Sequence, residues 1–201
     1  MLKHTMSSSF TIKASPNTDI WRKPPSTDVF TAPRGAAADT KTTAPLSSFK
    51  SARVSFLLHP KEQYDQAGLV LSLKSAGATG PLPGDSPPKW LKTGVEYYNG
   101  VPKAATVACD SWADWSLGDV KGKEGGWVTV LVENGTDVLG KSFWIYQVVD
   151  GEKVPLREVC WVFGHGDPGK WELSVEAYAC RPAKDAAELV VDFKDLDVQW
   201  A

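Results

Sequence analysis

The residue types best suited to chemistry lie on one face of a strand-like run that begins at Trp90. Side chains alternate between the two faces of a strand, so Lys92, Glu96 and Tyr98 share the face of Trp90. Residues four apart on a strand are about 13 Å apart at Cα, too far for a comfortable ion pair between Lys92 and Glu96. A small ligand lying over the intervening Gly94 could contact both charges, because glycine leaves the backbone open to close approach.

A second run, Tyr64–Leu73, places Gln66 on the corresponding face if the two strands are neighbours. We predict one site containing Gln66, Lys92 and Glu96, in which Glu96 and Lys92 are the candidate catalytic residues. The alternative is a solvated strand face on which the lysine and the glutamate only contact water.

A second pair of carboxylates, Glu172 and Glu176, alternates onto one face of the run Trp171–Cys180. Glycosidases need two carboxyl groups about 5–5.5 Å or 6.5–9.5 Å apart, which this strand spacing gives only if the side chains lean inward or a bulge tightens the strand. We therefore keep glycoside hydrolysis as a weaker alternative and retain Glu176 as a candidate ligand contact.

Aromatic side chains are the remaining candidate ligand contacts, since the chain contains nine tryptophans. We expect about two thirds of the tryptophans to fill the core, as large rings do between packed sheets. The sharper interpretation is a stacking platform for a sugar or another planar ligand, for which the candidates are Trp90, Tyr98, Trp112, Trp115, Trp144 and Tyr146.

No set of residues has the spacing of a metal or cofactor site, so we predict neither a metal nor a cofactor. His4, His59 and His165 are scattered, and a calcium site of loop aspartates, Asp110 and Asp114, is the weak alternative. The three cysteines have no ligand spacing and are expected to be reduced thiols in a cytoplasmic protein, with a Cys160–Cys180 bridge as the minor alternative.

Length and charge narrow the class of protein further. The 201 residues fit one domain over residues 7–201, preceded by a disordered leader over residues 1–6. The net charge of -2 and the lack of basic runs argue against nucleic acid or an anionic membrane as partner. No apolar signal peptide or membrane-spanning run of 18 residues occurs.

The elements that must position these side chains are strands. Period-2 alternation and turn signals every 8–12 residues predict an all-β, antiparallel two-sheet jelly roll. Asn99-Gly100, Asn134-Gly135 and Asp150-Gly151 are expected hairpin turns, and residues 15–47 and 110–120 are expected to be mostly loop. The expected strands are Ser8–Ala14, an edge strand near Asp28–Ala32, Ser48–Leu58, Tyr64–Leu73, Trp90–Tyr98, Val101–Cys109, Trp127–Glu133, Ser142–Val149, Val154–Phe163, Trp171–Cys180 and Leu189–Trp200.

Several short motifs together resemble one family, the regulation-of-enolase type of concanavalin A-like proteins found in fungi and bacteria. The resemblance covers about Phe10 to Trp200 and rests on Thr18-Asp19-Ile20-Trp21, Tyr64-Asp65-Gln66-Ala67-Gly68-Leu69, Trp90-Leu91-Lys92-Thr93-Gly94-Val95-Glu96, Trp112-Ala113-Asp114-Trp115-Ser116 and Tyr178-Ala179-Cys180-Arg181-Pro182.

The resemblance implies a jelly roll with one concave face, similar to lectins and β-glucanases, and a regulatory tie to enolase as a possible partner. This sequence departs from the family pattern at two places, and both affect which ligand the concave face could bind. The segment Lys74–Lys89 is longer and richer in Gly and Pro than expected, so it could wall the concave face, and Glu176-Ala177 stands where a small residue would be usual.

Three functions follow from these observations. The first is a small-molecule-binding protein whose ligand, sugar-like or another metabolite, lies on the concave face. The second is a cofactor-independent enzyme of isomerase or cyclase type in the same cleft, with Glu96 as acid or base and Lys92 as electrostatic stabiliser. The third is a regulatory protein that binds enolase.

Overall fold

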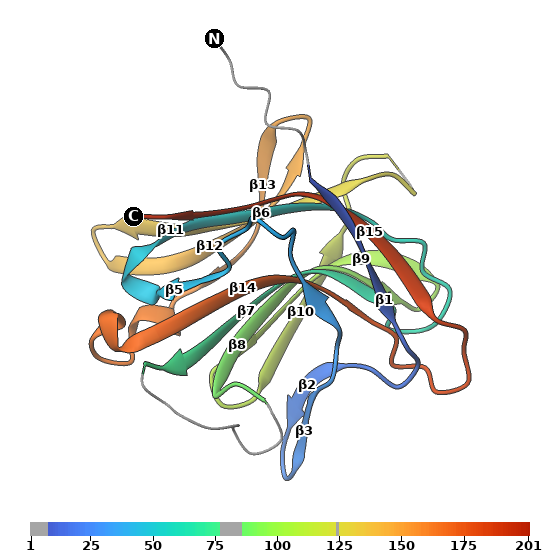
Figure 1. The fold of residues 1–201 in the computed structure, drawn as a ribbon, viewed down its shortest axis with the longest axis horizontal. Helices are drawn as coiled ribbons and strands as arrows, with labels where there is room; N and C mark the ends of the chain where they lie inside the picture. The colour runs from blue at the N-terminus through green and yellow to red at the C-terminus, as the bar shows by residue number, and fades with distance from the viewer. Residues whose placement is uncertain (1–7, 77–85, 124) are drawn as a thin grey trace.

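The computed structural model describes residues 8–76, 86–123 and 125–201, and these form two stacked antiparallel sheets (Figure 1). The predicted β-sandwich is confirmed. The predicted disordered leader, residues 1–6, lies outside the described residues. The first sheet has the order β1 (Ser9–Ala14), β15 (Leu189–Trp200), β6 (Phe49–Leu57), β11 (Val128–Asp137), β12 (Gly140–Val149) and β13 (Glu152–Val159).

The second sheet positions the candidate residues. Its order is β10 (Ala113–Asp119), β9 (Val101–Cys109), β8 (Lys89–Tyr98), β7 (Gln66–Ser75), β14 (Trp171–Cys180) and β4 (Arg34–Gly35), with β5 (Thr43–Pro45) also paired to β14. Short 3-10 helices cover Leu46–Ser48, Trp161–Phe163 and Pro168–Lys170. No helix among these residues is long and apolar enough to cross a membrane.

The main core lies between the sheets and follows the predicted alternation of β7. Ala67, Leu69, Leu71 and Leu73 all face it and are buried. Its large rings are phenylalanines, Phe49, Phe56, Phe143 and Phe193, rather than tryptophans. Six of the nine tryptophans, which all lie in the described part of the chain, belong to or pack against buried apolar clusters, in line with the expected two thirds. Trp90 is fully buried, and the other five are partly buried: Trp21, Trp115, Trp161, Trp171 and Trp200.

Two of the three predicted hairpin turns are confirmed. Asn99-Gly100 and Asp150-Gly151 both have the positive φ that such turns require. Asn134-Gly135 instead lies inside β11, and the chain turns between Asp137 and Gly140. A Cβ at Gly135 would lie 2.5 Å from Cδ1 of Trp144, so this glycine makes room for an aromatic ring.

Two segments expected to be mostly loop contain strands. Residues 113–119 form β10, the edge strand that pairs with β9. Within residues 15–47, β2 (Ile20–Lys23) and β3 (Thr27–Phe30) form a separate hairpin. β3 overlaps the edge strand expected near Asp28–Ala32, whereas β2 and its pairing with β3 were not predicted. The few apolar side chains of β2 belong to a long-range contact rather than to a local alternation.

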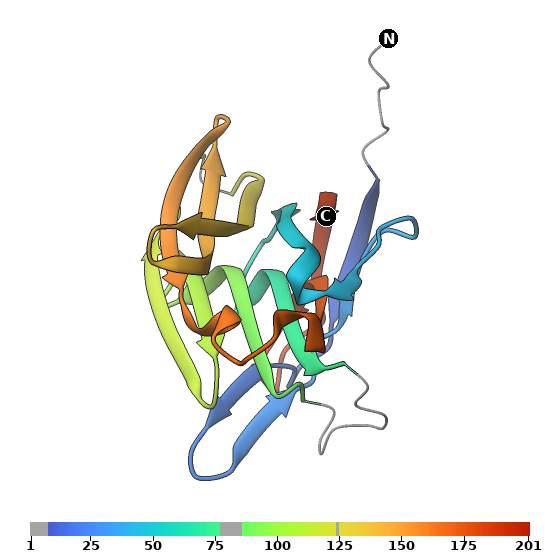
Figure 2. The same ribbon diagram turned by 90° about the vertical axis from the view of Figure 1, so that its left-hand side faces the viewer.

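The β2–β3 hairpin packs on the face of the second sheet that is turned away from the main core (Figures 1 and 2). Ile20 and Phe30 from the hairpin segment form a second core with Trp90, Val107 and Tyr178 of the sheet. Arg22 donates hydrogen bonds to the Pro87 and Pro88 carbonyls, which fastens residues 86–88 to the hairpin. The rest of the long loop, residues 77–85, lies outside the described residues.

Gly68 and Gly94 face each other across β7 and β8, and this contact explains both glycines. A Cβ at Gly94 would lie 1.9 Å from the Ala67 carbonyl oxygen, and one at Gly68 would lie 2.0 Å from the Thr93 carbonyl oxygen. Gly94 is therefore required by the neighbouring strand, whereas sequence analysis assigned it to ligand approach.

We expect Gly94→Ala to lower the free energy of unfolding by about 3 kcal/mol or more, because the added methyl group would collide with backbone that cannot move aside. Urea unfolding measures the change. Gly118→Ala on edge strand β10 is the matched control, since a Cβ there meets nothing within 4 Å. Equal stabilities for the two variants would contradict this account of the glycine pair.

Candidate functional site

The candidate site is a cavity of about 400 Å³ beside the β2–β3 hairpin, on the outer face of the second sheet. The hairpin segment, the start of β7, the middle of β8 and β10 all contribute to it. Its lining residues are Asp19, Trp21, Lys23, Tyr64, Gln66, Lys92, Glu96 and Trp115.

The floor of the cavity holds a buried lysine with two partners. Lys92 is 2% exposed, and its Nζ donates a 2.8 Å hydrogen bond to Oε1 of Gln66. The same Nζ lies 3.6 Å from Oδ1 of Asp19, which comes from the segment just before β2. Gln66 is itself buried, so both contacts are poorly solvated and the ammonium group is held in place.

Glu96 lies beside this group, whose ammonium pairs with Asp19 rather than with it. It is 5% exposed, and the indole N–H of Trp115 lies beside its carboxyl group. Burial raises its pKa from 4.5 to about 7, an effect that Asp19 strengthens and that Lys92 opposes. Near neutral pH this carboxyl group is therefore divided between its protonated and ionised forms.

The indole N–H of Trp115 lies beside the Glu96 carboxyl group. Its Nε1 is buried and forms no hydrogen bond of good geometry with the described residues, but it lies near enough to Glu96 to favour the ionised carboxylate. This buried donor has lost its hydration without gaining a well-formed hydrogen bond, and an incoming polar ligand could supply one.

Aromatic rings form the walls. Trp21 meets Trp115 edge to face, with 6.4 Å between ring centroids and 88° between ring planes. Tyr98 packs behind Trp115 at 5.2 Å and contacts Tyr64 at 5.9 Å. These contacts between rings from four segments hold the walls in defined orientations.

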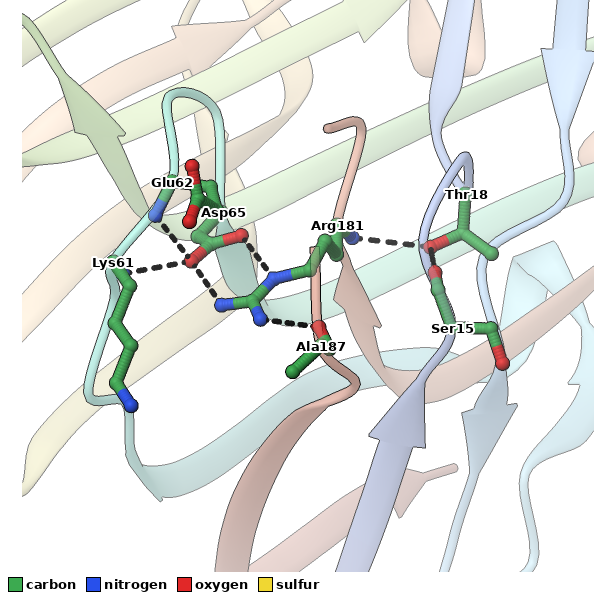
Figure 3. A network of polar contacts seen from close by, with 7 residues as sticks. All are labelled: Ser15, Thr18, Lys61, Glu62, Asp65, Arg181 and Ala187. Carbon is green, nitrogen blue, oxygen red and sulfur yellow. Dashed lines mark hydrogen bonds and ion pairs between the residues drawn. The ribbon is translucent and has the colours of Figure 1, made fainter. Parts of the chain in front are cut away.

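A buried ion pair holds the segments that carry these residues (Figure 3). Arg181 donates to both carboxylate oxygens of Asp65, from Nε at 2.9 Å and from an Nη at 2.6 Å. Asp65 also accepts hydrogen bonds from the backbone N–H groups of Lys61 and Glu62. Asp65 is fully buried and Arg181 is 3% exposed, so the pair is shielded from solvent.

The same arginine connects to the hairpin segment. Its backbone N–H donates to Oγ1 of Thr18 at 3.0 Å, and its carbonyl accepts from the Thr18 N–H at 3.1 Å. Asp19 follows Thr18, while Tyr64 and Gln66 flank Asp65. The ion pair therefore fixes the positions of cavity residues from two distant parts of the chain.

The cavity brings together four of the residues that the sequence singled out: Gln66, Lys92, Glu96 and Trp115. Tyr98 supports the wall from behind Trp115 and is not a lining residue. Trp90 is fully buried in the second core against Phe30, because the hairpin covers it. It is not available to a ligand in this structure.

The other candidate contacts lie elsewhere. Trp112 is exposed in the turn before β10. Trp144 and Tyr146 stack on each other on β12, in the opposite sheet. Glu176 forms an ion pair with Arg34 at 3.4 Å and lines a separate hollow of about 240 Å³.

The carboxylate pair considered for glycoside hydrolysis is also engaged in ion pairs. Glu172 lies 2.7 Å from Lys74, and Glu176 pairs with Arg34, so each carboxylate has its own cation. Neither is a lining residue of the candidate cavity. The same holds for the aspartates considered for calcium, because Asp110 contacts Lys89 and His165 while Asp114 contacts Arg157.

Four lining residues were not among the sequence candidates: Asp19, Trp21, Lys23 and Tyr64. Three of them belong to motifs that the sequence analysis quoted, Thr18–Trp21 and Tyr64–Leu69, without an assigned role. Their presence in short motifs with several polar or aromatic residues was the available signal. Their place in the cavity depends on the docking of the hairpin, which no local pattern encodes.

A larger hollow of about 590 Å³ lies at another end of the sandwich, near the β8–β9 turn. Its lining includes His59, Tyr97 and Lys123, none of which is buried. It lacks the poorly solvated polar groups that distinguish the Glu96 cavity, so we do not regard it as the functional site.

The pKa of Glu96 makes a prediction about stability. The folded protein keeps the proton up to about pH 7, whereas the group ordinarily loses it near 4.5. Folded protein thus binds more protons in this window, so stability falls as pH rises through it and stays lower above it. Glu96→Gln removes this cost, and we expect the variant to be about 2–3 kcal/mol more stable than wild type near pH 8.

Near pH 4.5 the two proteins should differ by no more than about 0.5 kcal/mol. Urea unfolding at several pH values measures both differences. Glu152→Gln, which changes an exposed carboxylate on β13, should follow the wild-type pH dependence. Parallel stability curves for wild type and Glu96→Gln would contradict the proposed protonation of Glu96.

The buried ion pair makes a second prediction. Arg181→Met leaves Asp65 charged and without its main partner, so we expect a loss of about 3–5 kcal/mol in the free energy of unfolding. Lys13→Met removes an exposed partner of Glu188 and should cost less than about 1 kcal/mol. Thermal and urea unfolding of both variants give the comparison. Similar decreases in the free energy of unfolding would contradict a stabilising role for the Asp65–Arg181 ion pair.

Comparison with known proteins gives relatives over nearly the whole chain. An uncharacterized protein of Emericella nidulans is 40% identical over 190 residues, which cover 94% of this chain and 86% of that protein. A crystal structure of a functionally unknown protein from Saccharomyces cerevisiae has a TM-score of 0.70 at 18% identity and covers 96% of this chain and 88% of its own.

A more distant structure shares the fold alone. The xyloglucan-locus protein GH43B of Bacteroides ovatus has a TM-score of 0.55 at 11% identity, and the match covers 94% of this chain but 32% of that one. The tie to enolase that the motifs implied is tested by none of these comparisons and stays a prediction. The family model described as protein of unknown function, DUF1349, matches residues 2–200, and the chain belongs to that family.

Proposed function

We propose that this protein binds a small, polar, ring-shaped metabolite, such as a sugar-like compound, in the cavity formed by the hairpin and strands β7, β8 and β10. The observation that carries the proposal is a nearly buried carboxyl group, Glu96, beside the buried Trp115 indole N–H, which forms no hydrogen bond of good geometry with the described residues, inside an aromatic enclosure. Native proteins leave few buried polar groups unsatisfied, and those few often belong to binding sites.

The polar groups of the cavity favour a ligand with hydroxyl groups. Trp115 offers a donor, Glu96 offers an acceptor or a donor according to its protonation, and Asp19 offers further acceptors. A hydroxyl group both donates and accepts, so neighbouring hydroxyls on one ring could satisfy this mixed array. A purely apolar ligand would leave the Trp115 N–H without a well-formed hydrogen bond.

The walls favour a ring. Trp21, Tyr64 and Trp115 present apolar faces and edges around the polar floor. Ligand sites are typically lined by aromatic surface with a few polar groups that fix orientation, and volumes of about 300–1,000 Å³ are usual. The cavity of about 400 Å³ falls within this range.

We also infer a reducing, cytoplasmic location from the thiols. Cys109, Cys160 and Cys180 are all free, and Cys109 and Cys180 are buried in the second core beneath the hairpin. Free thiols suit a compartment that keeps cysteines reduced. No contact among the described residues favours enolase over other protein partners.

A thermal-shift screen against sugars, cyclic polyols and glycolytic intermediates tests the binding proposal. A ligand at 100 times its dissociation constant stabilises the folded state by about 2.7 kcal/mol, or roughly 5–10 °C for a domain of this size. We expect at least one compound to give such a shift with wild type. The shift should be lost in Trp21→Ala, which removes part of the cavity wall.

Trp144→Ala is the matched control, because it removes an aromatic ring from the opposite sheet at a position that sequence analysis also favoured. This variant should keep the full shift. A ligand whose effect is lost in Trp144→Ala and kept in Trp21→Ala would move the binding site to β12 and overturn the proposal.

A further inference from the structure

Glu96 has a feature that ligand binding alone does not require. A binding site gains affinity when its carboxylate is held by donors, yet Lys92, the neighbouring cation, is engaged with Gln66 and Asp19 instead. The carboxyl group of Glu96 is 5% exposed, no cation among the described residues is paired with it, and the donor beside it is the neutral Trp115 indole N–H. Such a group is poorly stabilised as an anion and gains from taking up a proton.

These are the properties of a general base. A base works best when its pKa lies near the working pH, and burial without a partner is the usual way to raise a carboxylate to that range. The pKa of Glu96, at about 7, meets this condition. Its position on the central strand β8, with both strand neighbours paired along its length, also holds the side chain on a rigid element.

We propose that Glu96 is the general base of a proton transfer in this cavity, acting on a carbon next to a carbonyl group of the bound ligand. The inference rests on the proposed function, because the ligand must first occupy the same cavity. Its chemical class is thereby narrowed to a hydroxyaldehyde, a hydroxyketone or a 2-oxo acid, in cyclic or open form.

The step balances without an oxidant or reductant. The carboxylate of Glu96 takes the proton as the C–H bond breaks, and the electron pair of that bond forms the C=C bond of an enolate. The carbonyl oxygen receives the negative charge. Glu96 exchanges its proton with solvent and returns one to the same carbon, which gives labelling. Where the first carbon carries a hydroxyl group, Glu96 can instead protonate the former carbonyl carbon; the hydroxyl proton then passes to the enolate oxygen and the first carbon becomes the new carbonyl, which gives an isomer.

Lys92 is placed to stabilise the enolate oxygen. Its Nζ carries three N–H groups, of which one is directed to Gln66 and one faces Asp19, so another remains for a ligand oxygen. The Trp115 indole N–H is a second donor without a partner. Fixed donors of this kind act strongly on developing charge in a poorly solvated site.

The charged groups around Glu96 set the pH range in which its carboxyl group ionises, and with it the pH dependence of the proton transfer. Lys92 on the same strand favours the anion, whereas Asp19 from the hairpin segment opposes it. Lys23 is exposed at the rim, and Lys103 on β9 is paired with Asp119. Tyr178 of β14 stays neutral, because burial raises its pKa well above the usual value. Proton abstraction requires the carboxylate, so its rate should rise with pH through about 7.

Solvent deuterium exchange tests the proposal. Full-length protein is incubated in D₂O with a set of hydroxyaldehydes, hydroxyketones and 2-oxo acids, and deuterium at carbon is measured by mass spectrometry. We expect wild type to label at least one compound, and Glu96→Gln to label it at least ~100-fold more slowly. Lys92→Met should slow labelling by roughly 100-fold while Trp144→Ala leaves it unchanged.

Two results would overturn the assignment: labelling of no compound beyond the level seen with Glu96→Gln, or labelling by wild type that does not rise with pH. The thermal-shift screen run on the same compounds separates the two proposals. Binding without Glu96-dependent exchange removes the catalytic role and leaves the binding proposal standing. Neither binding nor exchange removes both.

Discussion

The buried ion pair between Asp65 and Arg181 is the interaction on which the candidate site depends. It joins the segment before β7 to the segment after β14, and the backbone of Arg181 joins both to Thr18 at the base of the hairpin. Charges buried in this way are costly unless every polar atom is satisfied, and here the Asp65 carboxylate also accepts two backbone N–H groups. The result is a fixed frame around the cavity, built from three segments that are far apart in the chain.

Within that frame the second sheet is buried on both faces, which is uncommon for antiparallel strands. One face packs on the main core, and the β2–β3 hairpin covers the middle of the other with Ile20 and Phe30. The hairpin does not cover Lys92 and Glu96 completely. These two residues are therefore shielded from bulk water and still line an open cavity. This partial cover explains how Glu96 comes to be buried without a cation among the described residues paired to it, a condition that lowers stability above neutral pH and suits proton transfer.

The motif resemblance and the cavity agree in an informative way. The motifs around Asp19, Gln66, Lys92–Glu96, Trp115 and Arg181 are scattered over the chain, and the structure brings all of them to the cavity or to the ion pair beside it. Trp144, Tyr146 and Glu176, which were chosen by strand parity or by analogy with carboxylate pairs, lie outside it. The alternation of side chains along a strand predicts which of them share a face. It does not predict which part of that face is covered by a segment distant in the sequence.

The sequence by itself determined most of the long strands, many of their boundaries and the side of β7 that faces the main core. These properties are local, because alternation along β7 and the positive-φ turns at Asn99-Gly100 and Asp150-Gly151 act over a few residues. Only the tertiary structure decided that Trp90 is buried, that Gly94 serves strand packing, and that Asp19 and Trp21 complete the cavity. Each of these depends on a contact between segments distant in sequence, either the β2–β3 hairpin on the second sheet or β7 against β8. Such contacts produce no periodic pattern of residue types in either segment, so the sequence alone does not reveal them.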